Sequence, residues 1–385
     1  MNRNPLLALA PAALLAAVMF AASCSRQAPL SPADTPDDAV TTVDLSVLRH
    51  IEMALRPPVT EGADAERRGR VVYVPAGSDD ALAGAIATAG AHGAVVLRAG
   101  VHHESGPVEI ATPVTLFGET GAVLESHIPT WPVASPTIQA ALWVHTPGFA
   151  MRGIEMRPEG GIGGTAILLD HAPGAAVFQN NLHDYQYGVL IEGSDRTRIF
   201  DNRISATPAW LSDPNVPEAH GIVNINGVGT IVARNTVTNA LFGIWACDRN
   251  GLAFGNQTSG NLIGLILCKV PLGSYPLPGG AVAGAQFSAT SWLAQSNVSF
   301  GNFATGLLII DSANGNHVVS NDSHDNGGYA VEFTADTFRF GFLTPASFNN
   351  VFVAGAFPNI QVKDCGNGNR ILGGKLVDNT LEPCD

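Results

Sequence analysis

A short pattern of one small residue followed by an apolar run recurs between Gly164 and Phe333. Successive units start 24, 33, 22, 21, 42 and 24 residues apart, at Gly164, Gly188, Gly221, Gly243, Gly264, Gly306 and Ala330. An asparagine beside a second apolar run keeps the same period, at Asn180, Asn202, Asn235, Asn256, Asn297 and Asn321. Two markers that share one period and absorb the same two insertions indicate a repeat protein.

Within each unit the apolar residues alternate as in a β-strand. We expect the first and third residues after the glycine to point inward, and these are Val189, Ile191, Ile244, Ala246, Leu265, Leu267, Leu307, Ile309, Val331 and Phe333. The second and fourth residues then point outward. They form two apolar columns, one of Leu190, Val223, Trp245, Ile266 and Leu308, the other of Leu168, Ile225, Cys247, Cys268 and Ile310.

Two interpretations of these outward columns stay open. Large apolar patches are rarely left open on soluble proteins, so a loop that contains Phe338, Phe340 and Phe342 is expected to cover them. Alternatively, the columns line a saccharide groove in which Trp245 is a stacking platform.

The asparagines precede the next apolar strand, as at a tight turn, because asparagine tolerates left-handed backbone geometry. Stacked amides can also hydrogen-bond to one another, so we predict a structural ladder. The pairs His183-Asp184 and His324-Asp325 fall at nearly equivalent positions in two units. This recurrence favours turns over a metal site or a catalytic base.

Three insertions interrupt the short repeat, at Thr207–His220, Val270–Trp292 and Thr334–Ser347. In repeat proteins insertions map to turns, and functional clefts are usually built there. The second and third follow the same strand of their units, so we expect them to project from one side.

Upstream of the repeats, Ser78 or Asp79 is expected to cap an alanine-rich helix that runs through Ala89. The stretch DALAGAIATAGAHGAVVLRAGVHHESGPVEIATPVTLFGETGAVLES resembles the opening of a right-handed parallel β-helix of the pectin-lyase-like superfamily. The resemblance covers roughly Val71 to Leu376. It implies an all-β solenoid of roughly 21–24-residue coils with an N-terminal capping helix that closes the open end. The superfamily includes lyases, hydrolases, epimerases, adhesins and proteins of unknown role, so it indicates little about chemistry.

The N-terminus resembles an export signal. Arg3 precedes an apolar stretch from Leu6 to Ala22, which ends in small residues followed by Cys24. The ending resembles a bacterial lipoprotein signal, in which the cysteine after the cleavage site is lipidated. The alternative is an ordinary cleaved signal with a free Cys24. We expect an exported protein of the bacterial cell envelope, in the outer membrane or periplasm or outside the cell, that contacts membrane only through this lipid anchor.

The chain divides into a signal peptide (1–23), a flexible tether (24–42), N-terminal helices and cap (43–92), the β-helix (93–377) and a C-terminal tail (378–385). In an oxidising compartment the remaining cysteines are expected to pair. Cys247 and Cys268 both stand four places after their glycine and should stack in neighbouring coils. Cys365 and Cys384 are expected to staple the tail.

The net charge of the chain limits the classes of ligand that it can bind. The 385 residues carry a net charge of −13, with only 20 lysines and arginines. A nucleic-acid ligand needs clustered cations for its phosphates, so this class of partner is excluded. A polysaccharide or cell-surface glycan remains the expected partner.

The fifth position after the glycines collects charged residues. Asp248, Lys269 and Asp311 are expected to stack on successive coils, next to Arg249 and at the start of the longest insertion. In β-helix lyases a lysine or arginine acts as the base. The resemblance therefore implies that these four residues are the candidate catalytic residues and that Trp245 binds substrate. The alternative is a cross-strand ion-pair ladder. No dedicated metal site and no certain cofactor is predicted, although Ca²⁺ is the ion that such carboxylates would hold.

Three functions follow. The first is an exported, lipid-anchored β-helix that binds or processes polysaccharide, with lyase chemistry on an acidic glycan if it is catalytic. The second is a non-catalytic cell-envelope scaffold or adhesion protein, which the lack of a recognisable acid–base set favours. The third is a periplasmic metal-handling accessory protein, which the scattered histidines and few methionines disfavour.

Overall fold

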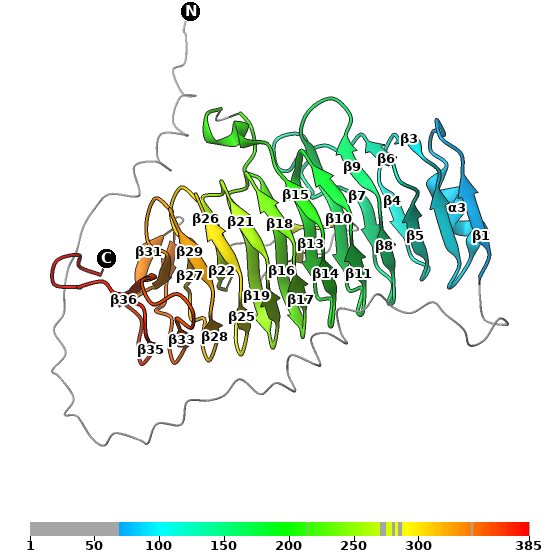
Figure 1. Cartoon of the computed structure of the whole chain (residues 1–385). Coiled ribbons are helices and arrows are strands. Elements are labelled where there is room, and N and C mark those ends of the chain that lie inside the picture. Colours follow the sequence, from blue (N-terminus) through cyan, green and yellow to red (C-terminus); the bar gives the residue numbers. More distant parts are fainter. Residues whose placement is uncertain are drawn as a thin grey trace, which may run out of the picture.

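The computed structural model describes residues 69–213, 215–269, 275–278, 282–283, 287–339 and 342–384. In these ranges the chain winds into a solenoid whose coils add strands to three parallel sheets (Figure 1). The predicted right-handed parallel β-helix is therefore confirmed. The predicted signal peptide, Cys24 and the tether lie outside the described residues. Among the residues that are described, no helix is long and apolar enough to cross a membrane.

We name the three sheets A, B and C, and their strands follow in spatial order for the described part of the chain. Sheet A consists of β1 (Val71–Val74), β2 (Ala94–Leu97), β5 (Thr115–Gly118), β8 (Ala150–Arg152), β11 (Ala176–Phe178), β14 (Arg198–Phe200), β17 (Ile231–Ala233), β20 (Leu252–Phe254), β25 (Leu293–Gln295), β28 (His317–Val319), β33 (Val351–Val353) and β35 (Arg370–Leu372). Sheet B consists of β3 (Gly100–Glu104), β6 (Ala122–Ser126), β9 (Glu155–Pro158), β12 (Asn181–His183), β15 (Arg203–Ser205), β18 (Thr236–Thr238), β21 (Gln257–Ser259), β26 (Val298–Phe300) and β29 (Asp322–His324). Sheet C consists of β4 (Val108–Ile110), β7 (Ala140–Val144), β10 (Gly163–Asp170), β13 (Tyr185–Glu192), β16 (His220–Val228), β19 (Phe242–Arg249), β22 (Ile263–Leu267), β27 (Leu307–Ile309), β30 (Val331–Phe333), β34 (Gln361–Asp364) and β36 (Lys375–Leu376).

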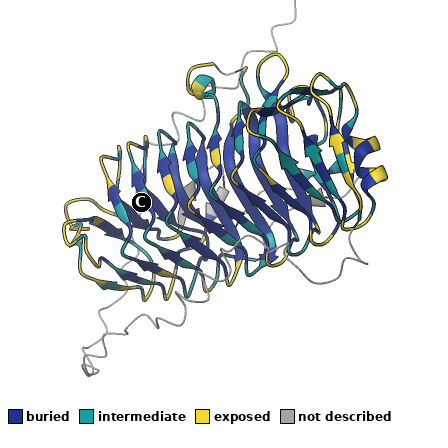
Figure 2. Cartoon of the chain, turned by 45° about the vertical axis from the view of Figure 1, so that its right-hand side comes forward, coloured by how far each residue is buried: buried dark blue, intermediate teal, exposed yellow. Residues whose placement is uncertain are grey.

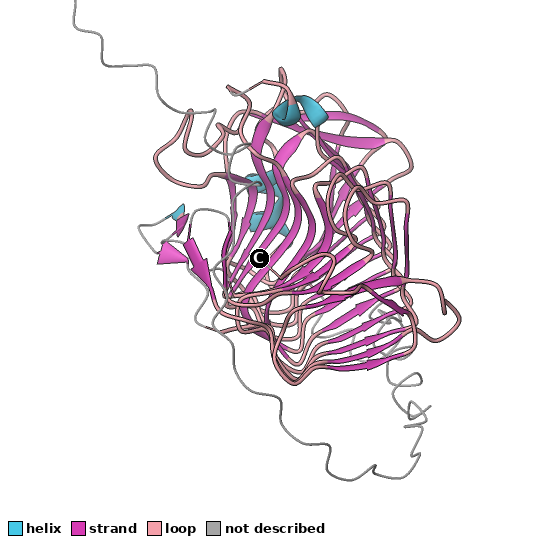
Figure 3. Cartoon of the chain, turned by 90° about the vertical axis from the view of Figure 1, so that its left-hand side faces the viewer, coloured by secondary structure: helices cyan, strands magenta, loops and turns pink. Residues whose placement is uncertain are grey.

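The three sheets enclose one apolar core along the solenoid (Figure 3). All ten residues predicted to point inward belong to this core. Buried residues follow the strands along the whole solenoid, whereas exposed residues gather at the turns (Figure 2). The alternation of the repeat therefore predicted the buried face of sheet C correctly.

The register of the first unit differs from the prediction. Ile167 pairs with Val189 and Leu168 with Leu190, so Ala166, not Gly164, occupies the place of Gly188. Leu168 consequently belongs to the outward column of Leu190 rather than to that of Ile225. The reason is that β10 begins at Gly163, which pairs with Tyr185, two residues later than a unit counted from Gly164 would require.

A short helix, α3 (Leu82–Ala89), covers the N-terminal end of the core with Leu82, Ile86 and two alanines. The predicted cap at Ser78 or Asp79 is wrong, because the helix begins later and its N-cap residue makes no side-chain bond. The N–H of Leu82 instead donates to the carboxylate of Glu104 on β3, at 2.9 Å. Burial raises the pKa of Glu104, while this N–H opposes the rise.

The repeated glycines are explained by the close approach of successive coils. A Cβ atom on Gly243 would stand 2.5 Å from the carbonyl oxygen of Gly264, and one on Gly264 would stand 2.6 Å from that of Gly306. Carbon and oxygen atoms do not pack at such distances in folded proteins. Any larger residue would push neighbouring coils apart.

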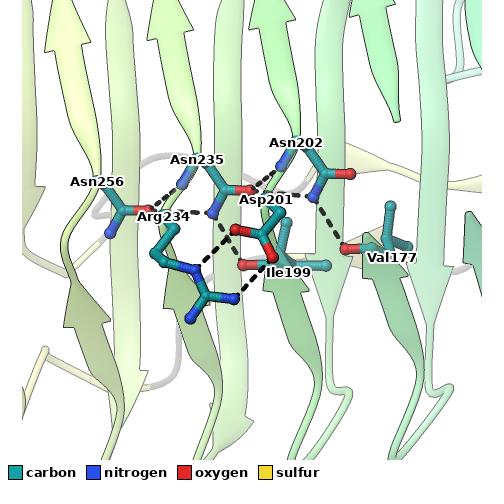
Figure 4. A network of polar contacts seen from close by, with 7 residues as sticks. All are labelled: Val177, Ile199, Asp201, Asn202, Arg234, Asn235 and Asn256. Carbon is teal, nitrogen blue, oxygen red and sulfur yellow. Dashed lines mark hydrogen bonds and ion pairs between the residues drawn. The ribbon is translucent and has the colours of Figure 1, made fainter. Parts of the chain in front are cut away.

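The predicted asparagine ladder is present (Figure 4). The side-chain amide of each asparagine donates to Oδ1 of the next, over 3.1 Å from Asn180 to Asn202. Figure 4 shows the next bond, from Asn202 to Asn235, over 3.0 Å. The series continues through Asn256, Asn297 and Asn321. Each Oδ1 also accepts the backbone N–H of the preceding asparagine. The ladder therefore satisfies buried donors at the turn between sheets A and B.

The insertions leave the coil at turns, as expected. The first contains the 3₁₀ helix η1 (Pro208–Leu211), and the others contain the two-stranded ribbons of β23 (Tyr275–Pro276) with β24 (Val282–Ala283) and β31 (Thr337–Arg339) with β32 (Phe342–Thr344). In the second insertion the carbonyl of Pro276 accepts the N–H of Ile138 at 2.8 Å. Leu277 joins a buried cluster on the outer face of sheet C. The outward apolar column is thus buried, in agreement with the covered interpretation, whereas the side chains of Phe338, Phe340 and Phe342 lie outside the described residues.

Replacing Asn235 with alanine is expected to destabilise the fold. The backbone and side-chain N–H groups of Asn202 would lose their shared acceptor in a buried turn. An unsatisfied buried donor costs about 1–3 kcal/mol, so urea unfolding should show a loss of at least that size. Asn215→Ala, at an exposed loop position, is the control and should change the free energy of unfolding by less than about 0.5 kcal/mol. Equal losses in the two variants would contradict the structural role of the ladder.

Candidate functional site

Asp248, one of the predicted catalytic residues, lies inside the solenoid. The alternation of β19 continues past Ala246, so the Asp248 side chain points inward and is completely buried. Its Oδ2 accepts the Thr230 hydroxyl at 3.0 Å, and its Oδ1 has no hydrogen-bond partner among the described residues. Burial raises the pKa of Asp248 to about 7, against the smaller opposite effects of Asn224, Thr230 and Trp292.

The other two residues of the predicted column, Lys269 and Asp311, are brought together, whereas Arg249 beside them is not. The backbone N–H of Lys269 donates to the Asp311 carboxylate, and the charge of Lys269 lowers the pKa of Asp311. Burial outweighs both effects and raises that pKa to about 6. Arg249 points away, with its guanidinium carbon 3.9 Å from the centre of the Phe287 ring. Lys269 is therefore joined to Asp311, whereas Asp248 and Arg249 have other partners.

Trp245, the predicted stacking platform, is 6% exposed. Its ring meets the Phe242 ring edge-on at 4.9 Å, and its indole N–H donates to the sulfur of Cys268. Cys268 is bonded to Cys247, with 5.0 Å between their Cα atoms. Trp245 thus supports the cystine on the covered face of sheet C. At the C-terminus a second disulfide joins the other predicted pair, Cys365 and Cys384.

The two His-Asp pairs are turns. His183 and His324 end the equivalent strands β12 and β29, and each Nδ1 lies within 2.9 Å of the following aspartate. Asp184 and Asp325 have φ angles of 62° and 53°, the left-handed geometry of a tight turn. Among the described residues, no three His, Cys, Asp or Glu side chains are grouped so that they could hold a metal ion.

A different pair of carboxylates stands on the outer face of sheet C. Asp170 and Glu192 are the last residues of the neighbouring strands β10 and β13 (Figure 1), and they pair directly in register. Both side chains point outward, because Leu169 and Ile191 before them point into the core. Like charges directly opposite each other destabilise a sheet, so this pairing needs an explanation other than stability.

The two carboxylates have different surroundings. Asp170 lies 2.7 Å from Nδ1 of His171 and accepts the indole N–H of Trp143 at 3.2 Å. Glu192 accepts the amide N–H of Asn226 at 2.8 Å through Oε1, and its Oε2 has no hydrogen-bond partner among the described residues. The pKa of Glu192 is raised to about 7, chiefly by burial and further by the charge of Asp170. Asn226 and His171 have the opposite, smaller effect.

More polar and aromatic groups surround the pair. His145 directly follows β7, the strand next to β10. It lies 2.7 Å from the Glu109 carboxylate, and its ring centre is 4.9 Å from that of Trp143. Asp170 and Glu192 are 8% and 6% exposed, whereas the His171 side chain is 73% exposed. The Asp170 and Glu192 carboxyls therefore lie at the base, whereas the His171 imidazole and the Glu109 carboxylate, whose side chain is 59% exposed, lie at the rim. We call this group the carboxylate patch: Glu109, Trp143, His145, Asp170, His171, Glu192 and Asn226.

The patch combines the elements of acid–base chemistry. A carboxyl group with a pKa near 7 is protonated often enough at neutral pH to donate a proton, and a neighbouring carboxylate can act as base or nucleophile. Perturbed pKa values of this kind concentrate at functional sites. The sequence-based interpretation missed both residues. Glu192, the fourth residue after Gly188, was the available signal, whereas the two-residue register difference at Gly164 hid Asp170.

No family model and no curated protein sequence matches the chain. Solved structures do resemble it. An endo-xylogalacturonan hydrolase from Aspergillus tubingensis aligns with 80% of this chain and 92% of its own, at 12% identity and a TM-score of 0.51. A polygalacturonase from Erwinia carotovora ssp. carotovora aligns with 83% of this chain and 100% of its own, at 12% identity and a TM-score of 0.49. The Dettilon tailspike protein aligns with 81% and 69%, at 14% identity and a TM-score of 0.44. Identities this low establish a shared parallel β-helix fold and nothing more specific.

The buried Asp248 should make stability depend on pH. Its pKa in the fold, about 7, exceeds the ordinary 3.8, so its contribution to stability is complete below pH 3.8 and is lost as the pH rises through about 7. Asp248→Asn should therefore reduce the loss of unfolding free energy between about pH 5 and about pH 8 by at least ~1 kcal/mol, measured by urea unfolding. Asp213→Asn, at an exposed position, is the control. A variant that keeps the wild-type pH slope would show that Asp248 does not titrate in this range.

Proposed function

We propose that this protein binds a polysaccharide along the outer face of sheet C and hydrolyses a glycosidic bond at Asp170 and Glu192. The observation that carries this proposal is the in-register pair of unlike carboxyl groups at the ends of β10 and β13. Glycoside hydrolysis uses two carboxyl groups on either side of the scissile bond. The endo-xylogalacturonan hydrolase that shares the fold acts on a polysaccharide, which supports this class of ligand.

The roles follow from the surroundings of each group. Glu192, with its pKa of about 7, is the general acid that protonates the oxygen of the leaving sugar. Asp170, which accepts the Trp143 indole N–H, is the base for the attacking water or the nucleophile. Trp143 is partly exposed beside Asp170 and provides an apolar surface for a sugar ring.

A second candidate is lyase chemistry on an acidic glycan, the reaction expected from the sequence. The contact between Lys269 and Asp311 next to the second insertion favours it. In that reaction Lys269, which is half-buried just after the interior strand β22 of sheet C, abstracts the proton or neutralises a substrate carboxylate. The two candidates use different residues and different products, so one set of variants separates them.

Glu192→Gln should lower the rate of polysaccharide cleavage by roughly 100-fold or more, since removing a general acid costs about 10²–10⁴-fold. Release of reducing ends measures hydrolysis, and absorbance of unsaturated products measures a lyase. Wild-type hydrolysis should also decline as the pH rises through about 7, because Glu192 loses its proton.

Glu159→Gln, at an exposed turn, is the matched control, and Lys269→Ala tests the second candidate. An unsaturated product that disappears in Lys269→Ala and persists in Glu192→Gln would contradict the hydrolase proposal. Glycan binding without turnover in the wild type would instead favour the non-catalytic envelope role.

We also propose that the protein is exported and held in the cell envelope by a lipid on Cys24. The sequence supports the lipid on Cys24, because residues 1–23 end in small residues directly before this cysteine. The four cysteines of the described chain are all paired, which suits an oxidising compartment.

Cys24→Ala should abolish incorporation of a labelled fatty acid and move the protein from the membrane fraction to the soluble fraction. Stable anchoring by lipid needs more than one acyl chain, and the variant would carry none on residue 24. The shift to the soluble fraction should therefore be nearly complete. Ser25→Ala is the control and should retain the label. An unlabelled wild-type protein would support the ordinary cleaved signal.

A further inference from the structure

The charges of the carboxylate patch point to the class of saccharide that it accepts. We infer that the sugar unit bound beside Asp170 and Glu192 carries no carboxylate, so that the substrate is an uncharged or amino-sugar polymer and not a polyuronate. This inference rests on the proposed function, and it departs from the acidic glycan that the sequence led us to expect.

The first step is the sign of the fixed charge. Three carboxyl groups stand on sheet C: Asp170 and Glu192 on the neighbouring strands β10 and β13, and Glu109 on β4, which β7 separates from β10. The groups able to offset them at close range are two imidazoles, and each is already placed against a carboxylate, His145 on Glu109 and His171 on Asp170. Among the described residues, no lysine or arginine forms an ion pair with any of the three.

The second step concerns the cations on neighbouring turns. Arg196, on the turn after β13, lies along Gly229, with its Cγ 3.6 Å from where a Cβ would stand on that glycine. Arg249, at the end of β19, lies over the Phe287 ring. Neither is among the groups that shift the pKa of Glu192, whereas His171 and Asp170 are. The acidic charge of the patch is thus not neutralised by these arginines.

The third step is the consequence for a bound ligand. A sugar carboxylate beside the Asp170 carboxylate, with Glu192 ionised in part near neutral pH, would be repelled in a partly desolvated site, where charges interact more strongly than in water. A polyuronate site needs a cation or a metal ion at this point, and the described residues contain no group of three metal-ligating side chains. Repulsion of this kind weakens binding by at least ~10-fold.

The fourth step is what the patch offers in place of a cation. Carboxylate oxygens are strong acceptors for sugar hydroxyl groups, and for the ammonium group of an amino sugar. The Trp143 ring, held by its indole bond to Asp170, offers an apolar face to the C–H groups of a sugar. A hydroxyl-rich ring without a carboxylate satisfies both.

The test measures binding by calorimetry with the Glu192→Gln variant, which keeps the shape of the site, suppresses turnover and leaves the carboxylates of Asp170 and Glu109 in place. Three oligosaccharides of equal length are compared at low salt: one uncharged (xylan- or glucan-derived), one from chitosan and one from polygalacturonate. We expect the uncharged or the chitosan oligosaccharide to bind at least ~10-fold more tightly than the oligogalacturonate, with a smaller difference at high salt.

Glu109→Lys, made in the same background, should improve oligogalacturonate binding selectively, because it places a cation at the rim of the patch. Glu159→Lys, which adds the same charge on the turn after β9, is the control and should not. Oligogalacturonate binding that is as tight as the others overturns the charge inference while leaving cleavage at Glu192 intact. Failure of all three oligosaccharides to bind overturns both the inference and the proposed function.

Discussion

The hydrogen bonds between the side-chain amides of asparagines in successive coils hold the solenoid in one register. Each Oδ1 accepts two N–H groups from the preceding coil, so a coil that slips by one residue leaves two buried donors without an acceptor. A slip would also turn the whole apolar set of a strand outward. The ladder therefore fixes which residues stand above one another on the outer face. Asp170 and Glu192 are 22 positions apart in the chain and become neighbours only because the coils are held in this register.

Much of the fold could be predicted from the chain because the repeat states it several times. The alternation at Val189 and Ile191 recurs in each later unit, and every recurrence reduces the chance of a wrong assignment. The repeated glycine has a direct steric cause in the carbonyl of the next coil. The end of the solenoid has no such repetition. The N–H of Leu82 is capped by Glu104, a residue of a different coil that local helix-capping patterns do not reveal.

The candidate site was less accessible to prediction, for reasons visible in three residues. Asp248 follows Ala246 by two positions, so strict alternation places it inward, whereas the repeat pattern predicted it in a stacked column with Lys269 and Asp311. Asp170 was hidden because β10 starts two residues later than a unit counted from Gly164 would require. Asn226 has a φ of 61° at an irregularity between β16 and β19, and this geometry brings its amide to Glu192. A periodic sequence pattern does not predict local backbone irregularities of this kind, and such irregularities often occur at functional sites.

The hydrogen bond from Ile138 to Pro276 has a consequence for how the molecule unfolds. In a simple solenoid each coil contacts only its neighbours, so the structure can fray from either end one coil at a time. This bond joins the segment before β7 to the insertion after β22, five strand positions along sheet C or about 24 Å at ~4.8 Å per strand. The coils between them, which include Asp170 and Glu192, are enclosed in a closed loop of contacts. They are expected to open as one cooperative block while the terminal coils exchange their amide protons independently.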